Sequence, residues 1–140
     1  MQVVASSPQP TLQFDVTAPD GAARRITLFT GTVDVAPPDA GRRFRVASSD
    51  PNGVPISFYV GDPRELPLTG AVLVAEAWIA RMPISTGAED TLRYGIVGAE
   101  GRLAGVEGNP GRGLPYIRGL VFGGDLTMTI AYRLTAMTNP

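Results

Sequence analysis

Alternation of apolar and polar residues is the feature that most restricts how this chain can fold. Apolar side chains occupy every second position of LTMTIAYRLTAM, residues 126–137: Leu126, Met128, Ile130, Tyr132, Leu134 and Ala136. Successive side chains of a strand point to opposite faces, so this pattern predicts a half-buried β-strand with these six residues facing inward.

Two further strands are predicted near the start of the chain. Residues 11–17 alternate, with Leu12, Phe14 and Val16 on the side expected to be half-buried, and residues 25–35 read as a second strand with a bend or bulge at Gly31. Residues 18–21 (APDG) lie between them and favour a turn, because proline presets φ and glycine accepts positive φ.

The middle of the chain predicts more strands and one ambiguous segment. Residues 42–60 are expected to form a hairpin that turns at DPNG, and residues 91–107 a second one that turns at residues 98–101. Residues 71–80 (AVLVAEAWIA) fit a buried strand or a short helix, and their valines and flanking Gly70 and Pro83 favour the strand.

Together these patterns predict an all-β, antiparallel β-sandwich or barrel-like domain, since capped helical periodicity is missing elsewhere. A chain of 140 residues suits one domain, assigned to residues 11–140. Residues 1–10 (MQVVASSPQP) are predicted to be an extended arm, because their serines and prolines disfavour regular structure. Val3 and Val4 would give this arm its apolar contacts with a neighbouring subunit.

A second candidate contact region is VEGNPGRGLPY, residues 106–116. It lacks the lysine and the Ser/Thr of a phosphate-binding loop, and Pro115 stands where a helix would begin. We therefore expect a long, irregular loop, either merely solvated or a partner surface that uses Arg112, Tyr116 and Arg118.

The residue types that are missing argue against most catalytic chemistry. The chain contains no Cys and no His, and all 12 of its basic residues are Arg. A Ser-His-Asp triad, a thiol nucleophile, a Schiff-base lysine and an imidazole metal ligand are therefore excluded. Carboxylates and hydroxyls remain, and a distant pair such as Glu76 with Asp125 stays open. We expect a protein that is not an enzyme and binds no cofactor or metal.

The net charge and the hydropathy of the chain limit the classes of partner that it is expected to bind. A net charge of −1 offers no excess to neutralise a phosphate backbone, so no nucleic-acid partner is expected. An apolar run of about 18 residues is missing, so no membrane span is expected. Charged residues make up 18% of the chain, against the usual ~25%, which favours a surface partly covered by an assembly.

Two isolated features have competing interpretations. RRFR puts Arg43 and Arg45 on one face of a strand, either as charges that protect an exposed edge or as a docking patch for an acidic partner. Trp78, between Ala77 and Ile79, is predicted to lie in the core rather than to form a sugar-binding platform.

The MQVVASSPQP arm, the Cys-free β domain and the GNPGRGLP segment together resemble the small capsid decoration (cement) proteins of tailed bacteriophages. This resemblance implies a non-enzymatic, often trimeric protein on the virion surface that clamps neighbouring subunits of the major capsid protein. It carries no catalytic residues over to this chain. Two alternatives stay open: another virion component of the tail or connector, or a carbohydrate- or ligand-binding β-sandwich module that uses Tyr59, Trp78, Tyr94 and Tyr116.

Overall fold

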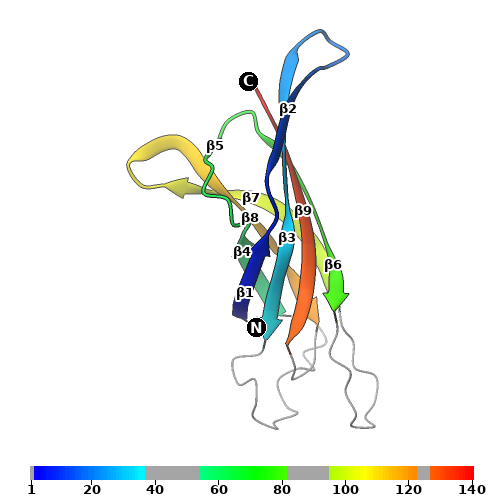
Figure 1. Cartoon of the computed structure of the whole chain (residues 1–140). Coiled ribbons are helices and arrows are strands. Elements are labelled where there is room, and N and C mark those ends of the chain that lie inside the picture. Colours follow the sequence, from blue (N-terminus) through cyan, green and yellow to red (C-terminus); the bar gives the residue numbers. More distant parts are fainter. Residues whose placement is uncertain (1, 37–53, 82–94, 123–126) are drawn as a thin grey trace, which may run out of the picture.

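The fold was obtained as a computed structural model that describes residues 2–36, 54–81, 95–122 and 127–140. These residues form two antiparallel sheets packed as a β-sandwich, which confirms the all-β prediction (Figure 1). The strands are β1 (Gln2–Pro8), β2 (Leu12–Thr17), β3 (Ala23–Ala36), β4 (Val54–Tyr59), β5 (Leu66–Pro67), β6 (Val72–Arg81), β7 (Gly95–Val106), β8 (Asn109–Phe122) and β9 (Met128–Thr138).

The first sheet, sheet A, has the order β1-β3-β9-β6, and β2 also pairs with β3. Strands β1 and β2 lie end to end along the same edge of β3, where β1 pairs with residues 31–36 and β2 with residues 23–28. The predicted turn at residues 18–21 joins β2 to β3, and Gly21 adopts a φ of 82° there. The far end of this hairpin extends beyond the rest of the sandwich (Figure 1).

The second sheet, sheet B, is built around β8. Strand β7 pairs with one edge of β8, and β4 and β5 pair with the other. A two-residue turn, Glu107 and Gly108, joins β7 to β8, and Gly108 supplies the positive φ of 78° that such tight hairpins need. The tip of this hairpin projects away from the sandwich (Figure 1).

The core fills the space between the two sheets. Strand β9 is the central element of sheet A, and its side chains alternate between buried and more exposed positions as predicted, while Leu126 lies outside the described residues. Sheet B contributes Ile56, Phe58 and Val60 from β4 and the residue after it, together with Ile117 and Val121 from β8. Period-two hydrophobic patterning on both sheets thus produces one apolar layer.

A close approach of three elements lies at Gly31. The Tyr132 hydroxyl donates a hydrogen bond of 2.9 Å to the Val60 carbonyl oxygen, and its ring packs against that of Phe58 with 5.3 Å between centroids. A side chain at Gly31 would meet this hydroxyl and the backbone of Ser7 and Pro8. Glycine at position 31 therefore permits the approach of β1, and the pairing of β3 with β9 runs through it without the predicted bulge.

Several expectations need correction. Residues 2–8 form β1, so the serines and Pro8 do not keep the arm out of regular structure, because an edge strand needs hydrogen bonds on one side only. Residues 106–116 are not a long loop but belong mostly to the β7–β8 hairpin. The turn expected at residues 98–101 is a bulge in β7, where Gly98 has a φ of 63°.

Two other segments can be compared directly. Residues 72–81 form β6, so the strand interpretation of the ambiguous segment is confirmed. Strand β2 exists as predicted, but Leu12, Phe14 and Val16 are exposed rather than half-buried. The turn expected at DPNG and the strand before it lie outside the described residues.

Candidate interaction surfaces

The outer face of sheet A carries two neighbouring rows of mostly apolar side chains that are exposed or half-buried. Residues paired directly across neighbouring strands share a face, so the register can be read as rows. One row consists of Phe14, Ile26, Met137 and Val72, and the next of Leu12, Leu28, Thr135 and Val74. We call these eight residues, together with Val16, the sheet A patch.

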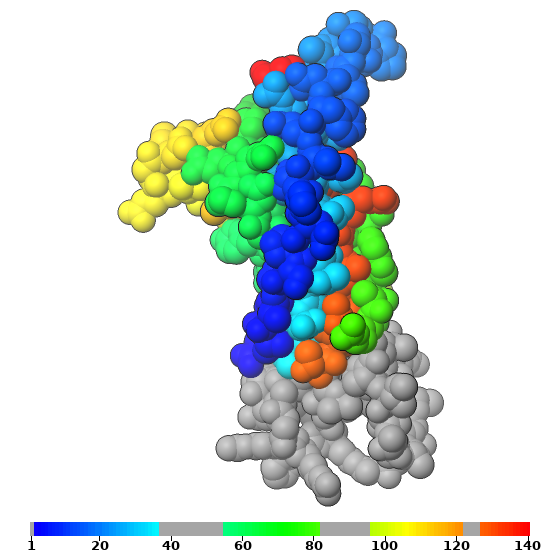
Figure 2. Space-filling model, viewed as in Figure 1, coloured from blue at the N-terminus to red at the C-terminus, as the bar shows by residue number. Residues whose placement is uncertain are grey.

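The exposure of the sheet A patch distinguishes it from the core. Phe14 is 50% exposed, and Val72 and Val74 are each 55% exposed. Figure 2 shows β3, β9 and β6 side by side on this surface, with β1 and β2 along the outer edge of β3. Isolated exposed apolar residues are ordinary, but an apolar row four strands wide, such as the row of Phe14, with further apolar residues beside it, is typical of an interaction surface.

A charged row borders the patch. Glu76 of β6 and Arg133 of β9 lie opposite each other in the register and form an ion pair. Beyond them on β6 lies Trp78, which is 49% exposed. The prediction that Trp78 belongs to the core is therefore wrong. A signal was available, because Trp78 shares its side of the period-two pattern with Glu76.

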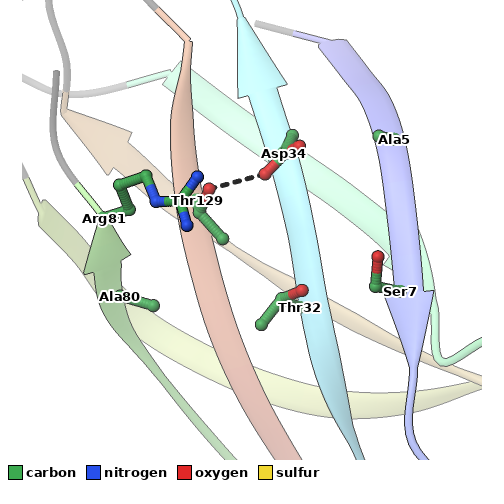
Figure 3. Close-up of a pocket in the computed structure, with 7 residues that line it drawn as sticks. All are labelled: Ala5, Ser7, Thr32, Asp34, Ala80, Arg81 and Thr129. Carbon is green, nitrogen blue, oxygen red and sulfur yellow. Dashed lines mark hydrogen bonds between the residues drawn. The ribbon is translucent and has the colours of Figure 1, made fainter.

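A shallow polar depression follows at the far end of the same face (Figure 3). Seven residues line it: Ala5, Ser7, Thr32, Asp34, Ala80, Arg81 and Thr129. The Thr129 hydroxyl donates a 2.6 Å hydrogen bond to Asp34, and the Arg81 side chain reaches across β9 toward Thr129 (Figure 3). The depression offers hydroxyls, a carboxylate and a guanidinium, which suit polar contacts at the end of an otherwise apolar face.

The outer face of sheet B brings together three predicted contact residues. Arg112, Tyr116 and Arg118 occupy even-numbered positions of β8 and therefore share one face of that strand. Tyr116 packs edge-on against Tyr59 of β4, with 6.0 Å between ring centroids. Arg112 donates a hydrogen bond of 3.0 Å to the Glu65 carbonyl oxygen, so part of its role is to hold the segment before β5 against the hairpin.

The other predicted contact residues lie elsewhere. Val3 and Val4 are in β1, at the free edge of sheet A, where a bulge shifts the register between Val3 and Ala5. They are both exposed, but they are not part of the sheet B surface. Arg43 and Arg45 lie outside the described residues, as do Tyr94 and Asp125.

One ion pair in the β2–β3 hairpin shifts the pKa of both its partners away from their ordinary values. The Arg25 guanidinium donates hydrogen bonds of 2.9 and 3.2 Å to the Asp15 carboxylate. These bonds, assisted by the opposite charge, lower the pKa of Asp15 below its ordinary value and raise the pKa of Arg25. In the core, burial raises the pKa of the Tyr132 phenol.

The residues that the structure describes hold neither a cluster of metal ligands nor a membrane-spanning helix. Within residues 2–36, 54–81, 95–122 and 127–140, no three acidic, His or Cys side chains gather as a metal site. In the same ranges, no helix has the length and hydropathy to cross a membrane. Glu76, one half of the carboxylate pair left open by the sequence, is held in its ion pair with Arg133.

Comparison of the chain with protein-family models, curated proteins and solved structures finds no match. The two exposed sheet faces are the features of this chain that bear on its function.

Proposed function

We propose that this protein is a non-enzymatic structural subunit that binds other protein subunits through its exposed sheet faces. The sheet A patch is the observation that carries this proposal. Leaving rows of Leu, Phe, Val and Met in water is unfavourable by roughly 25 cal/mol for each Å² that a partner could bury. A partner that covers these rows recovers that free energy, which makes association the expected role of the face.

The finer form of the proposal is that the partner is a phage capsid, which the protein decorates and stabilises by clamping neighbouring subunits of the major capsid protein. This form rests on the resemblance to capsid decoration proteins. The position of β1 supports a modified version of the contact expected from the N-terminal arm. Val3 and Val4 are exposed at the edge of a sheet, so a capsid strand could pair beside them, but β1 itself belongs to the domain.

Co-sedimentation with purified, undecorated phage shells tests the proposal. The wild-type chain should pellet with the shells in a saturable amount, and Tyr116→Ala combined with Arg118→Ala should weaken binding more than tenfold. Arg25→Ala, which removes an arginine from the side of the β2–β3 hairpin opposite the sheet A patch, is the matched control and should bind like the wild type. Failure of the wild-type chain to bind any shell would count against the virion proposal.

A carbohydrate- or ligand-binding module is the second candidate, and one observation favours it. Tyr59 is exposed on the outer face of sheet B beside Tyr116, with Arg118 and Glu100 paired across the next row. Aromatic faces flanked by charged hydrogen-bonding groups are suited to sugar rings. A screen of oligosaccharides by calorimetry would support this function if heat of binding is found and is lost in Tyr59→Ala.

A further inference from the structure

The sheet A patch continues into a whole sheet face that is large enough for a stable interface. The face runs from the row of Phe14 to the row of Asp34 and is four strands wide. With strands about 4.8 Å apart and a rise of about 3.4 Å per residue, it covers roughly 19 by 34 Å. That footprint, roughly 650 Å², comes close to the ~800 Å² that each partner buries in a standard interface.

The charges of the face suit a second copy better than a strongly charged partner. Glu76 is paired with Arg133 at the border of the patch, and Asp20 with Arg24 at the hairpin end, where the two side chains approach to 3.6 Å. Since Glu76 and Asp20 each have a guanidinium beside them, and Asp34 at the far end of the face accepts a hydrogen bond from Thr129, two copies can approach with little build-up of like charge. A strongly acidic or basic partner would find no complementary field here.

The shapes of the rows also match when two copies face each other. A two-fold axis parallel to the strands, midway between the copies, would place each row opposite the same row of the other copy. The outermost strands then exchange neighbours, so that β2 of one copy lies over β6 of the other. Leu12 and Phe14, which are large, would face Val74 and Val72, which are smaller. Large against small at facing positions is how sheets interdigitate at a separation of about 10 Å.

We propose that sheet A of one copy packs face to face against sheet A of a second copy about this two-fold axis. The pairing goes beyond the proposed function and requires no shell. An isologous two-fold contact closes with two copies. The free protein is therefore expected to be a dimer, rather than the trimer that the resemblance implies.

Sedimentation equilibrium of the full chain over a wide concentration range tests the pairing. Val74→Asp places a charge in the centre of the patch and should weaken dimerisation more than tenfold. Val97→Asp is the matched control, because Val97 is 50% exposed, against 55% for Val74, but lies on the outer face of sheet B. The control should dimerise like the wild type.

A second variant covers the case in which Val74→Asp fails to fold. Phe14→Asp alters the exposed strand β2 and should also produce monomers, with an unchanged circular dichroism spectrum. A wild-type chain that is monomeric or trimeric at every concentration overturns the pairing, and so does a Phe14→Asp variant that dimerises normally. Shell binding by a monomeric wild-type chain would overturn the pairing and leave the proposed function standing.

Discussion

Replacement of Gly31 by alanine is expected to separate β1 from the sandwich. A Cβ at position 31 would lie 2.7 Å from the Tyr132 hydroxyl, 2.8 Å from the Ser7 carbonyl oxygen and 2.9 Å from Pro8 Cα. Ordinary van der Waals contact begins at 3.4 Å, so all three neighbours would have to move. Two of these atoms are backbone, and a side-chain rotation cannot relieve the contact. Strand β1 must shift outward or leave β3.

The size of the effect follows from overpacking and from the lost pairing. Forcing a methyl group into a filled site costs about 1 to 3 kcal/mol, and a shifted β1 also weakens the hydrogen bonds along its edge. We expect the free energy of unfolding to fall by about 2 to 3 kcal/mol. For a chain of this size, that corresponds to a decrease in Tm of roughly 6 to 15 °C.

Urea denaturation followed by circular dichroism measures the effect, with Gly105→Ala as the matched control. A Cβ at Gly105, in β7, meets no atom within 4 Å. We therefore expect that control to stay within about 0.5 kcal/mol of the wild type.

A chain that lacks residues 1–8 tests whether contact with β1 causes the loss of stability in Gly31→Ala. Without residues 1–8, β3 keeps its pairing with β9, and Gly31→Ala should then cost at least about 1 kcal/mol less than in the full chain. An equal cost in both backgrounds would refute the clash with β1. An unchanged urea midpoint for Gly31→Ala in the full chain would refute the close approach itself.

Three further outcomes are expected. In an NMR titration, the Asp15 carboxyl of the wild type should lose its proton at a lower pH than in Arg25→Gln, since Arg25 lowers the pKa of Asp15. The stabilisation by this ion pair is present above the unfolded pKa of about 3.9 and is lost as the pH falls through the folded pKa. Equal titration in both chains would contradict this. Burial raises the pKa of Tyr132, so the stability of the wild type should decline above about pH 10 more steeply than that of Tyr132→Phe. At neutral pH, Tyr132→Phe should lose about 1 kcal/mol of stability, because it lacks the hydrogen bond to the Val60 carbonyl oxygen. Parallel stability profiles of the two chains against pH would refute the raised pKa. Fluorescence of Trp78, the single tryptophan, should be readily quenched by acrylamide in monomeric Phe14→Asp, and protection equal to that of a core tryptophan would contradict its exposed position.

Local patterns in the sequence determine most of the strands. The alternation in β9 identifies both the strand and its buried face, because a strand in the middle of sheet A packs only one of its two sides against sheet B. The turn at residues 18–21 follows equally from its own proline and glycine. These features need no knowledge of distant residues.

The same local patterns give wrong predictions for segments whose structure depends on pairing with distant strands. The glycines and prolines of residues 106–116 resemble a loop, but β7, β4 and β5 provide pairing partners that hold this segment as a strand. The serines and prolines of residues 2–8 resemble a free arm, but the edge of β3 binds them. Glycine and proline weaken a strand without forbidding it, and pairing decides the outcome.

The candidate surfaces show most clearly which features the sequence determines and which the tertiary structure determines. The sequence by itself shows that Phe14 lies on the apolar side of its strand, and that Val74 shares its side of β6 with Glu76. Only the tertiary structure decides that Phe14 points away from the core, because sheet B covers just one face of sheet A and does not extend under the β2–β3 hairpin. The shared face of Arg112, Tyr116 and Arg118 likewise depends on the pairing that makes β8 a strand. Periodicity separates the two faces of a strand, whereas the packing of distant strands determines which apolar faces become the interior and which remain available to a partner.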